Sequence, residues 1–221
     1  MGFFDEAVPD GVLEPPLLRA RQRDQRYQPP RDWVLPAVLP WGRRLAEGSA
    51  TVIALDHVEC WPEGATLQLR AMMRDGWDGA SGPPALRHPR ADGWHVGLEF
   101  ADGRRVVHLD GSHRGPQVRE VPPDEPLLVM GAGSSWGPYF RTLSLYLTPL
   151  PAGPWKLVTQ WRERGIEETV VPLDGDAVRE RAAEAIEVWT DLPEAPPSAS
   201  TVTGGGTSVS ARPAVRRERP D

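Results

Sequence analysis

The sequence predicts a mainly β protein: an antiparallel β-sandwich with one C-terminal helix, either immunoglobulin-like or closed in part into a barrel. Three observations support this. About eight short runs with strand-like patterning lie between residues 51 and 173, turn dipeptides separate them, and no helical pattern is interleaved. One amphipathic pattern follows at 176–190, which we expect to be a helix.

The chain divides into three regions by composition. Residues 1–32 form a Pro- and Arg-rich arm that we expect to be flexible, 33–192 form the sandwich with its helix, and 193–221 form a tail that we expect to be disordered. The stretch 33–41 contains two Trp and two Pro, too apolar for a free linker and unsuited to a helix. We therefore expect it to lie extended against the body as a clasp.

The first strands form a predicted hairpin. Thr51–Trp61 is closed by a Pro-Glu-Gly turn and followed by 66–73, in which apolar residues alternate with polar ones. This alternation places four side chains on one buried face: Leu67, Leu69, Ala71 and Met73.

A second hairpin joins 94–100 to 105–109 through Asp102-Gly103, a dipeptide typical of the two-residue type I′ turn. With that turn, Leu98 pairs with Val107 and Val96 pairs with Leu109. The opposite face then collects a set of polar side chains: His95, Glu99, His108 and Asp110.

The last third of the chain predicts a β-meander and the helix. After an apolar run at 126–130 and a Gly-rich link at 131–137, strands are expected at 139–148, 155–162 and 166–173. Asp174 is a candidate N-cap, and the helix has one apolar stripe that we expect to cap an open end of the sandwich or cover a sheet edge. The stripe is Val178, Ala182, Ala185, Ile186 and Trp189, and we expect Trp155, Trp161 and Trp189 to fill the core.

These same segments carry a resemblance to known sequences. The Trp155–Trp161 strand, the Pro-Gly turn before it and the segment Gly165-Ile-Glu-Glu-Thr169 resemble a group of uncharacterised proteins from GC-rich actinobacteria. The resemblance spans roughly residues 33–189. It implies a common fold and a cytosolic bacterial setting, and it carries no activity or functional residue across.

Composition limits the function classes. A net charge of −6 gives no basic face for nucleic acid, and no apolar run approaches the roughly 20 residues of a membrane span. A single Cys excludes an intrachain disulfide, no signal-peptide pattern opens the chain, and we expect a cytoplasmic protein. Cys60 has no assignable base beside it, so we interpret it as a buried structural thiol.

Few motifs point to chemistry. The Gly-rich link lacks the Lys-Ser/Thr of a phosphate-binding loop and opens a strand rather than a helix, so we expect no nucleotide and no other cofactor. One alternative is a metal- or small-ligand-binding protein or enzyme that uses His95, His108 and Asp110, because imidazole and carboxylate are common metal ligands. The simpler interpretation is that these three residues lie on the solvent-exposed face of a hairpin.

Nine Trp residues are the clearest compositional anomaly. Trp77 and Trp136 lie in predicted loops, where exposed rings serve as interface anchors or stack on sugars. We expect a non-enzymatic interaction module that binds a partner protein through these two residues. The alternatives are a carbohydrate-binding β-sandwich and self-association through an edge strand.

Overall fold

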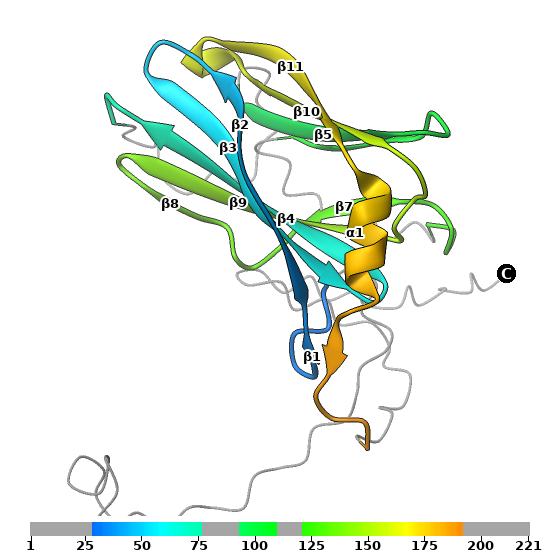
Figure 1. The fold of residues 1–221 in the computed structure, drawn as a ribbon. Helices are drawn as coiled ribbons and strands as arrows, with labels where there is room; N and C mark the ends of the chain where they lie inside the picture. Colours follow the sequence, from blue (N-terminus) through cyan, green and yellow to red (C-terminus); the bar gives the residue numbers. More distant parts are fainter. Residues whose placement is uncertain (1–27, 77–92, 110–120, 192–221) are drawn as a thin grey trace, which may run out of the picture.

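The computed structural model describes residues 28–76, 93–109 and 121–191, and these form two antiparallel sheets that face each other, with one helix at their side (Figure 1). This confirms the prediction of a mainly β, sandwich-like fold. A third, two-stranded ribbon projects from one end. The predicted arm before residue 28 and the tail after residue 191 lie outside the described residues.

The larger sheet has six strands. Its order is β2 (Ala37–Glu47), β3 (Thr51–Trp61), β4 (Gly64–Met73), β9 (Phe140–Thr148) and β7 (Leu127–Met130), and β8 (Ser135–Gly137) also pairs with β9. The predicted β3–β4 hairpin is confirmed, with Trp61 opposite Gly64. The alternation predicted for β4 is also confirmed, because all four apolar side chains of that face are buried: Leu67, Leu69, Ala71 and Met73.

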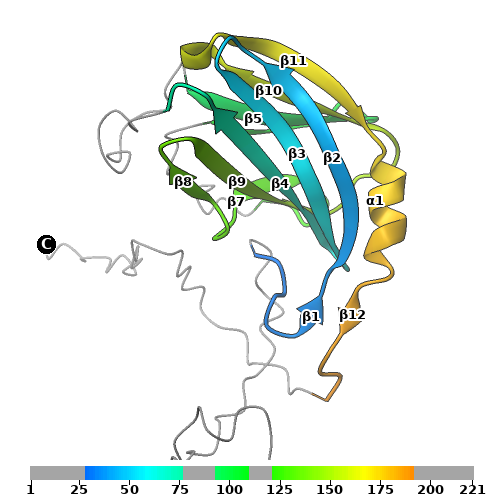
Figure 2. The same ribbon diagram turned by 60° about the vertical axis from the view of Figure 1, so that its left-hand side comes forward.

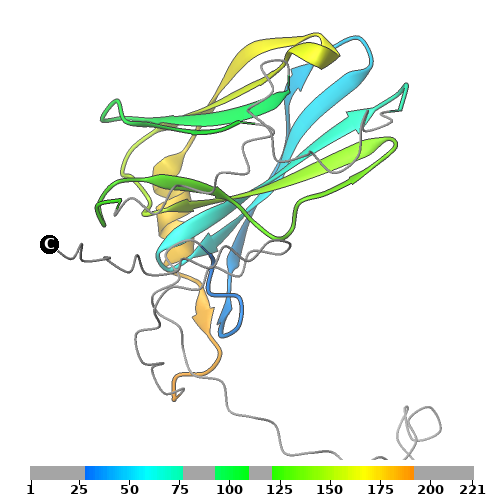
Figure 3. The same cartoon turned by 180° about the vertical axis from the view of Figure 1, so that it is seen from behind.

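The smaller sheet has the order β11 (Ile166–Leu173), β10 (Trp155–Trp161), β5 (Trp94–Phe100) and β6 (Arg105–His108). The predicted meander over 139–173 is therefore wrong. β9 lies in the six-stranded sheet, and residues 149–154 carry the chain across to β10 in the other sheet (Figure 3). Strand patterning located all three strands but held no information about which sheet each one joins.

The register predicted for the β5–β6 hairpin is wrong by one residue. Ala101, Asp102 and Gly103 form a three-residue loop: the Gly103 amide donates to Phe100 O at 2.9 Å, and the Phe100 amide donates to Arg104 O at 3.0 Å. Gly103 has φ +84°, the left-handed residue that such loops require. A one-residue slip moves every side chain to the other face. Consequently His108 is buried opposite Val96, and Val107 points to solvent.

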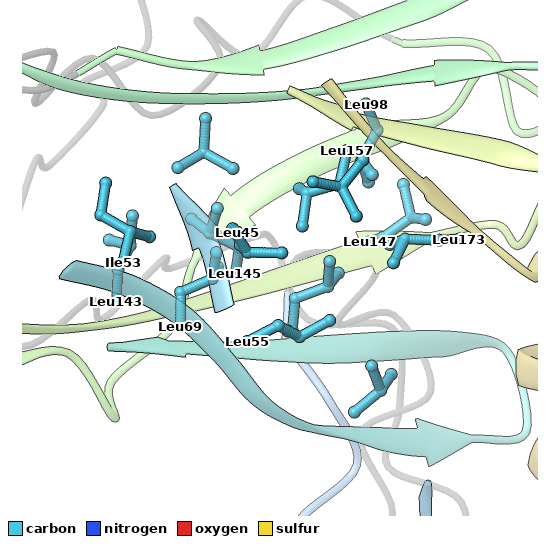
Figure 4. Packing of buried hydrophobic residues seen from close by; sticks show 14 of the residues in the cluster. Leu45, Ile53, Leu55, Leu69, Leu98, Leu143, Leu145, Leu147, Leu157 and Leu173 are labelled. Carbon is cyan, nitrogen blue, oxygen red and sulfur yellow. The ribbon is translucent and has the colours of Figure 1, made fainter. Parts of the chain in front are cut away.

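The core fills the space between the sheets. Figure 4 shows Leu98 and Leu157 of the smaller sheet pointing toward Leu145 and Leu147 of the larger one. At one end, Trp94 and Trp161 sit opposite each other on β5 and β10, with ring centroids 5.5 Å apart and planes 5° apart. Trp155 is also buried, so two of the three predicted core tryptophans are confirmed.

Helix α1 (Gly175–Ala182) closes one side of the sandwich near β2, β3 and β4 (Figure 2). The Asp174 carboxylate caps it by accepting from the Ala177 amide at 3.0 Å, as predicted. Val178 and Ala182 are buried in the core. No helix of the described ranges has the length and hydrophobicity needed to span a bilayer.

The predicted helix end at residue 190 is wrong. The helix stops at Ala182, and β12 (Ile186–Glu187) pairs antiparallel with β1 (Val34–Leu35). Ile186 and Trp189 are exposed rather than buried, because the chain has passed the end of the sandwich and finds strand partners there. A short apolar stripe fits a helix and a following strand equally well.

The clasp prediction for 33–41 is confirmed in outline. β1 packs through Val34 against Trp61 and Tyr146, and β2 continues as an edge strand beside β3. Pro40 lies in that edge strand, the kind of strand to which proline is confined in sheets.

Candidate functional site

The Gly-rich segment folds back tightly on β9 and does not form an open loop. The Gly131 amide donates to Ser144 O at 2.7 Å, and the Ser135 amide donates to Thr142 Oγ1 at 3.0 Å. A Cβ on Gly131 would lie 3.1 Å from the Ser144 hydroxyl, so this approach is close. The glycines therefore allow the segment to pass close to the backbone of β9. The amides of Gly131 and Ser135 already donate hydrogen bonds within the protein.

Trp136 stands at the end of this segment, in β8, and is 64% exposed. The sequence therefore located one exposed aromatic residue. Trp77 lies outside the described residues, but its neighbour Gly76 is described: it has φ +72°, and a Cβ there would lie 3.3 Å from the Tyr139 ring. Gly76 therefore lies at the same end of the larger sheet as Trp136.

Three further large side chains are exposed at the same end of the larger sheet as Trp136. Tyr139 is 64% exposed, Met72 45% and Phe140 43%. Phe140 pairs with Met72 on one side and with Gly137 on the other, and its ring lies over Gly137. We call these four residues the aromatic corner: Met72, Trp136, Tyr139 and Phe140.

The aromatic corner wraps around the end of the sheet. Met72 and Phe140 point away from the sandwich, opposite to the buried residues of their strands. Trp136 pairs with Arg141, the next residue along β9, and so points to the other face. The sequence could have found Met72, because the alternation of β4 already turned it outward. Tyr139 and Phe140 carry no such signal, since their exposure depends on where β9 lies in the sheet.

A shallow pocket adjoins the aromatic corner. Its volume is about 270 Å³, and the β2–β3 turn and the end of β4 line it: Glu47, Gly48, Ser49, Ala50, Thr51, Val52, Met72, Met73 and Arg74. Val52 pairs with Met72, and Met72 pairs with Phe140, so the pocket continues into the corner as one outward-facing row. Glu47 and Arg74 place one negative and one positive charge at the rim of the pocket. Glu47 forms an ion pair with Arg44.

Backbone and arginine contacts hold this end of the sheet in place. The Met73 amide donates to Tyr139 O at 2.9 Å, and the Arg74 amide donates to Ala50 O at 2.8 Å. Arg164, from the β10–β11 connection, donates to Gly76 O at 2.6 Å and to both Asp75 carboxylate oxygens at 3.1 Å. Such bonds fix the surface before any partner arrives, which lowers the entropy cost of binding.

The structure does not bring His95 and His108 together. His95 lies opposite Gln160 on the outer face of the smaller sheet, whereas His108 lies on the core face. Asp110 is outside the described residues. Among residues 28–76, 93–109 and 121–191, no three His, Cys, Asp or Glu side chains cluster closely enough to hold a metal ion.

Cys60 is buried beneath α1, and burial raises the pKa of its thiol to about 11. A raised thiol pKa means that the neutral form predominates, with about one thousandth as thiolate at pH 8. We predict that the folded protein reacts with an aromatic disulfide reagent over hours at pH 8. In urea, one thiol per chain should react within seconds. Complete reaction within seconds in the native state would contradict the buried, neutral thiol.

No protein-family model matches the chain, and no curated protein or solved structure is significantly similar to it. The function proposed below therefore rests on the chain's own residues and geometry.

Proposed function

We propose that this protein is a non-enzymatic interaction module that binds a partner protein through the aromatic corner and the adjoining pocket. The observation that carries this proposal is that four large side chains are exposed at one end of the larger sheet, two of them, Met72 and Phe140, in one row with a pocket of about 270 Å³. Single exposed apolar residues are ordinary on a protein surface, but a group of this composition at one end of a sheet is typical of interaction sites.

The residue types favour a protein partner. Trp, Tyr, Phe and Met are enriched where proteins bind each other, and Trp and Tyr dominate binding energy when a partner excludes water from them. In the proposed complex Trp136 and Tyr139 are the anchors, and the pocket beside Met72 receives an apolar side chain of the partner. Glu47 and Arg74 at the rim would set its orientation. The proposed setting is the cytoplasm, where a lone thiol such as Cys60 remains reduced.

The test compares what the immobilised protein retains from a bacterial lysate, quantified by mass spectrometry. Trp136→Ala and Tyr139→Ala should each reduce retention of the specific partner about 30-fold, the effect of losing roughly 2 kcal/mol at a hot spot. Val38→Ala is the matched control, because Val38 is an exposed apolar residue on β2 away from the corner. It should leave retention unchanged.

Two outcomes would reject the proposal. One is a set of retained proteins that is identical for the wild type and both corner variants. The other is release of the bound material by soluble oligosaccharides, which would assign the exposed rings to sugar stacking instead. All three substitutions are at exposed positions, so the melting temperature should stay within about 2 °C and exclude unfolding as the cause.

A further inference from the structure

The outer face of the four-stranded sheet carries an apolar stripe that crosses all four strands. Val170 lies opposite Val158, Val158 opposite Gly97, and Gly97 opposite Val107, so the four residues form one row on one face. Val107 is 63% exposed and Val170 51% exposed. We call this row the valine stripe. Figure 1 shows that α1 lies at the side of the sandwich and leaves this face uncovered.

A row of alternating charge runs beside the valine stripe. Lys156 lies opposite Glu99, and Glu99 opposite Arg105. Lys156 Nζ is 2.7 Å from one Glu99 oxygen, and Arg105 Nη2 is 2.5 Å from the other. The hydrogen bond from Lys156, and then that from Arg105, lowers the pKa of Glu99, so this carboxylate is ionised at neutral pH. We call Lys156, Glu99 and Arg105 the charged row.

We propose that two copies of the chain pair face to face through this sheet, about a twofold axis that runs parallel to the strands between β5 and β10. Such an axis places β10 of one copy over β5 of the other, and β11 over β6, so the same patch serves both copies. Sheets that pack face to face keep their strands within about 30° of each other, as this axis requires.

The register makes this face complementary to itself. Under the twofold axis, Lys156 of each copy meets Glu99 of the other, and both such pairs are of opposite charge. Val158 meets Gly97, which has no side chain and so leaves room on β5 for the valine of the other copy. A methyl group of Val107 fills part of that room. Val170 meets Val107, so the most exposed side chains of the valine stripe become covered. A second copy is therefore the occupant that the charges and shape both fit.

The size of the face predicts a weak dimer. The four strands are 8, 7, 7 and 4 residues long, and at about 3.3 Å per residue and about 4.8 Å between strands they cover about 410 Å² per copy, or roughly 800 Å² in total. This is below the roughly 1,200 Å² at which stable complexes begin, and it is the size of transient contacts. We therefore expect association to be visible only at high protein concentration, from tens to hundreds of micromolar.

Sedimentation equilibrium of the full chain with charge-reversed variants tests the proposal. The wild type should show a mean mass that rises toward twice 24.4 kDa with concentration. Glu99→Lys and Lys156→Glu should each raise the dissociation constant at least about tenfold, because each variant opposes like charges across the axis. An equimolar mixture of the two variants should associate again, since the lysine introduced at position 99 meets the glutamate introduced at position 156.

The controls separate this dimer from the proposed partner-binding function. Trp136→Ala leaves the sheet face intact and should self-associate like the wild type. Lys156→Glu breaks one surface ion pair and Glu99→Lys breaks two, and such pairs contribute little to stability, so both variants should remain folded by circular dichroism. A wild type that is monomeric at every concentration would overturn the dimer, as would association that survives both reversals or a mixture that fails to recover. None of these results bears on the aromatic corner.

Discussion

Replacing Trp161 with alanine is expected to lower the free energy of unfolding by about 3–5 kcal/mol. The Trp161 side chain is fully buried and lies flat against Trp94 at 5.5 Å. The guanidinium groups of Arg141 and Arg164 both lie 5.9 Å from its ring. Removing the indole therefore creates a large cavity and takes away a stacking partner and the ring beside two cations at once.

The neighbours of Trp161 cannot move to fill this cavity. Trp94 is held by its indole N–H, which donates to Thr159 Oγ1 at 3.0 Å. Arg164 is held by its bonds to Asp75 and Gly76. A site that cannot collapse lies at the upper end of the range of costs for a deleted side chain.

Urea denaturation followed by far-ultraviolet circular dichroism measures this effect without relying on tryptophan fluorescence. Trp161→Phe keeps an aromatic ring and should cost less than half as much. Trp136→Ala is the matched control, an identical substitution at an exposed site, and should change the free energy of unfolding by about 0.5 kcal/mol or less. Equal losses for the two alanine variants would show that the stack is not part of the core.

Local patterning was sufficient to predict most strands of the two sheets and the buried face of β4. In β4, period-two alternation alone separated Leu67 and Leu69 from the outward Met72, because a sheet with one buried face imposes that period. The N-cap at Asp174 was predictable for a similar reason, since it depends on bonds within three residues. Such features are set by near neighbours in the chain.

Register was not predictable at the β5–β6 hairpin. An Asp-Gly pair suits a two-residue loop, but Gly103 in left-handed backbone also completes a three-residue loop, and either register buries one of the adjacent Val106 and Val107. This shift of one residue separates two of the three proposed metal ligands, because it turns His108 toward the core and away from His95.

Local patterning also could not predict which sheet each strand joins, nor the residues that form the aromatic corner. The strands β9 and β10 are consecutive in the chain, yet they belong to different sheets, and this choice depends on contacts with β4 and β5. The aromatic corner follows from the same choice, because pairing with β4 places Phe140 beside Met72. Trp136 could be suspected from its Gly-rich context, whereas its companions required the sheet order.

Replacing Gly175 with alanine is expected to destabilise the protein by about 2–3 kcal/mol. The sign of this effect is informative. Gly175 begins α1, and in a free helix alanine is about 1 kcal/mol more favourable than glycine. Here a Cβ would lie 2.3 Å from Trp155 Nε1 and 2.4 Å from Gly153 O. The steric cost therefore reverses the intrinsic preference.

Neither obstacle can give way easily. Gly153 O belongs to the backbone, and the Trp155 indole donates to Pro151 O at 3.0 Å while meeting Phe100 edge-on at 5.8 Å. The helix must shift instead, which partly withdraws Val178 from the core and uncovers Cys60. We therefore expect two linked changes: a lower urea midpoint, and faster reaction of the Cys60 thiol at pH 8.

Gly103→Asn is the control for replacing a glycine. Gly103 has nothing within 4 Å of a Cβ position, and asparagine tolerates its left-handed backbone, so this variant should lose less than about 1 kcal/mol and keep its thiol protected. If Gly175→Ala were as stable as the wild type with Cys60 still protected, α1 could not sit against Trp155 as described. If it were destabilised without exposing the thiol, the clash would be relieved within the 149–154 connection and the helix would stay in place.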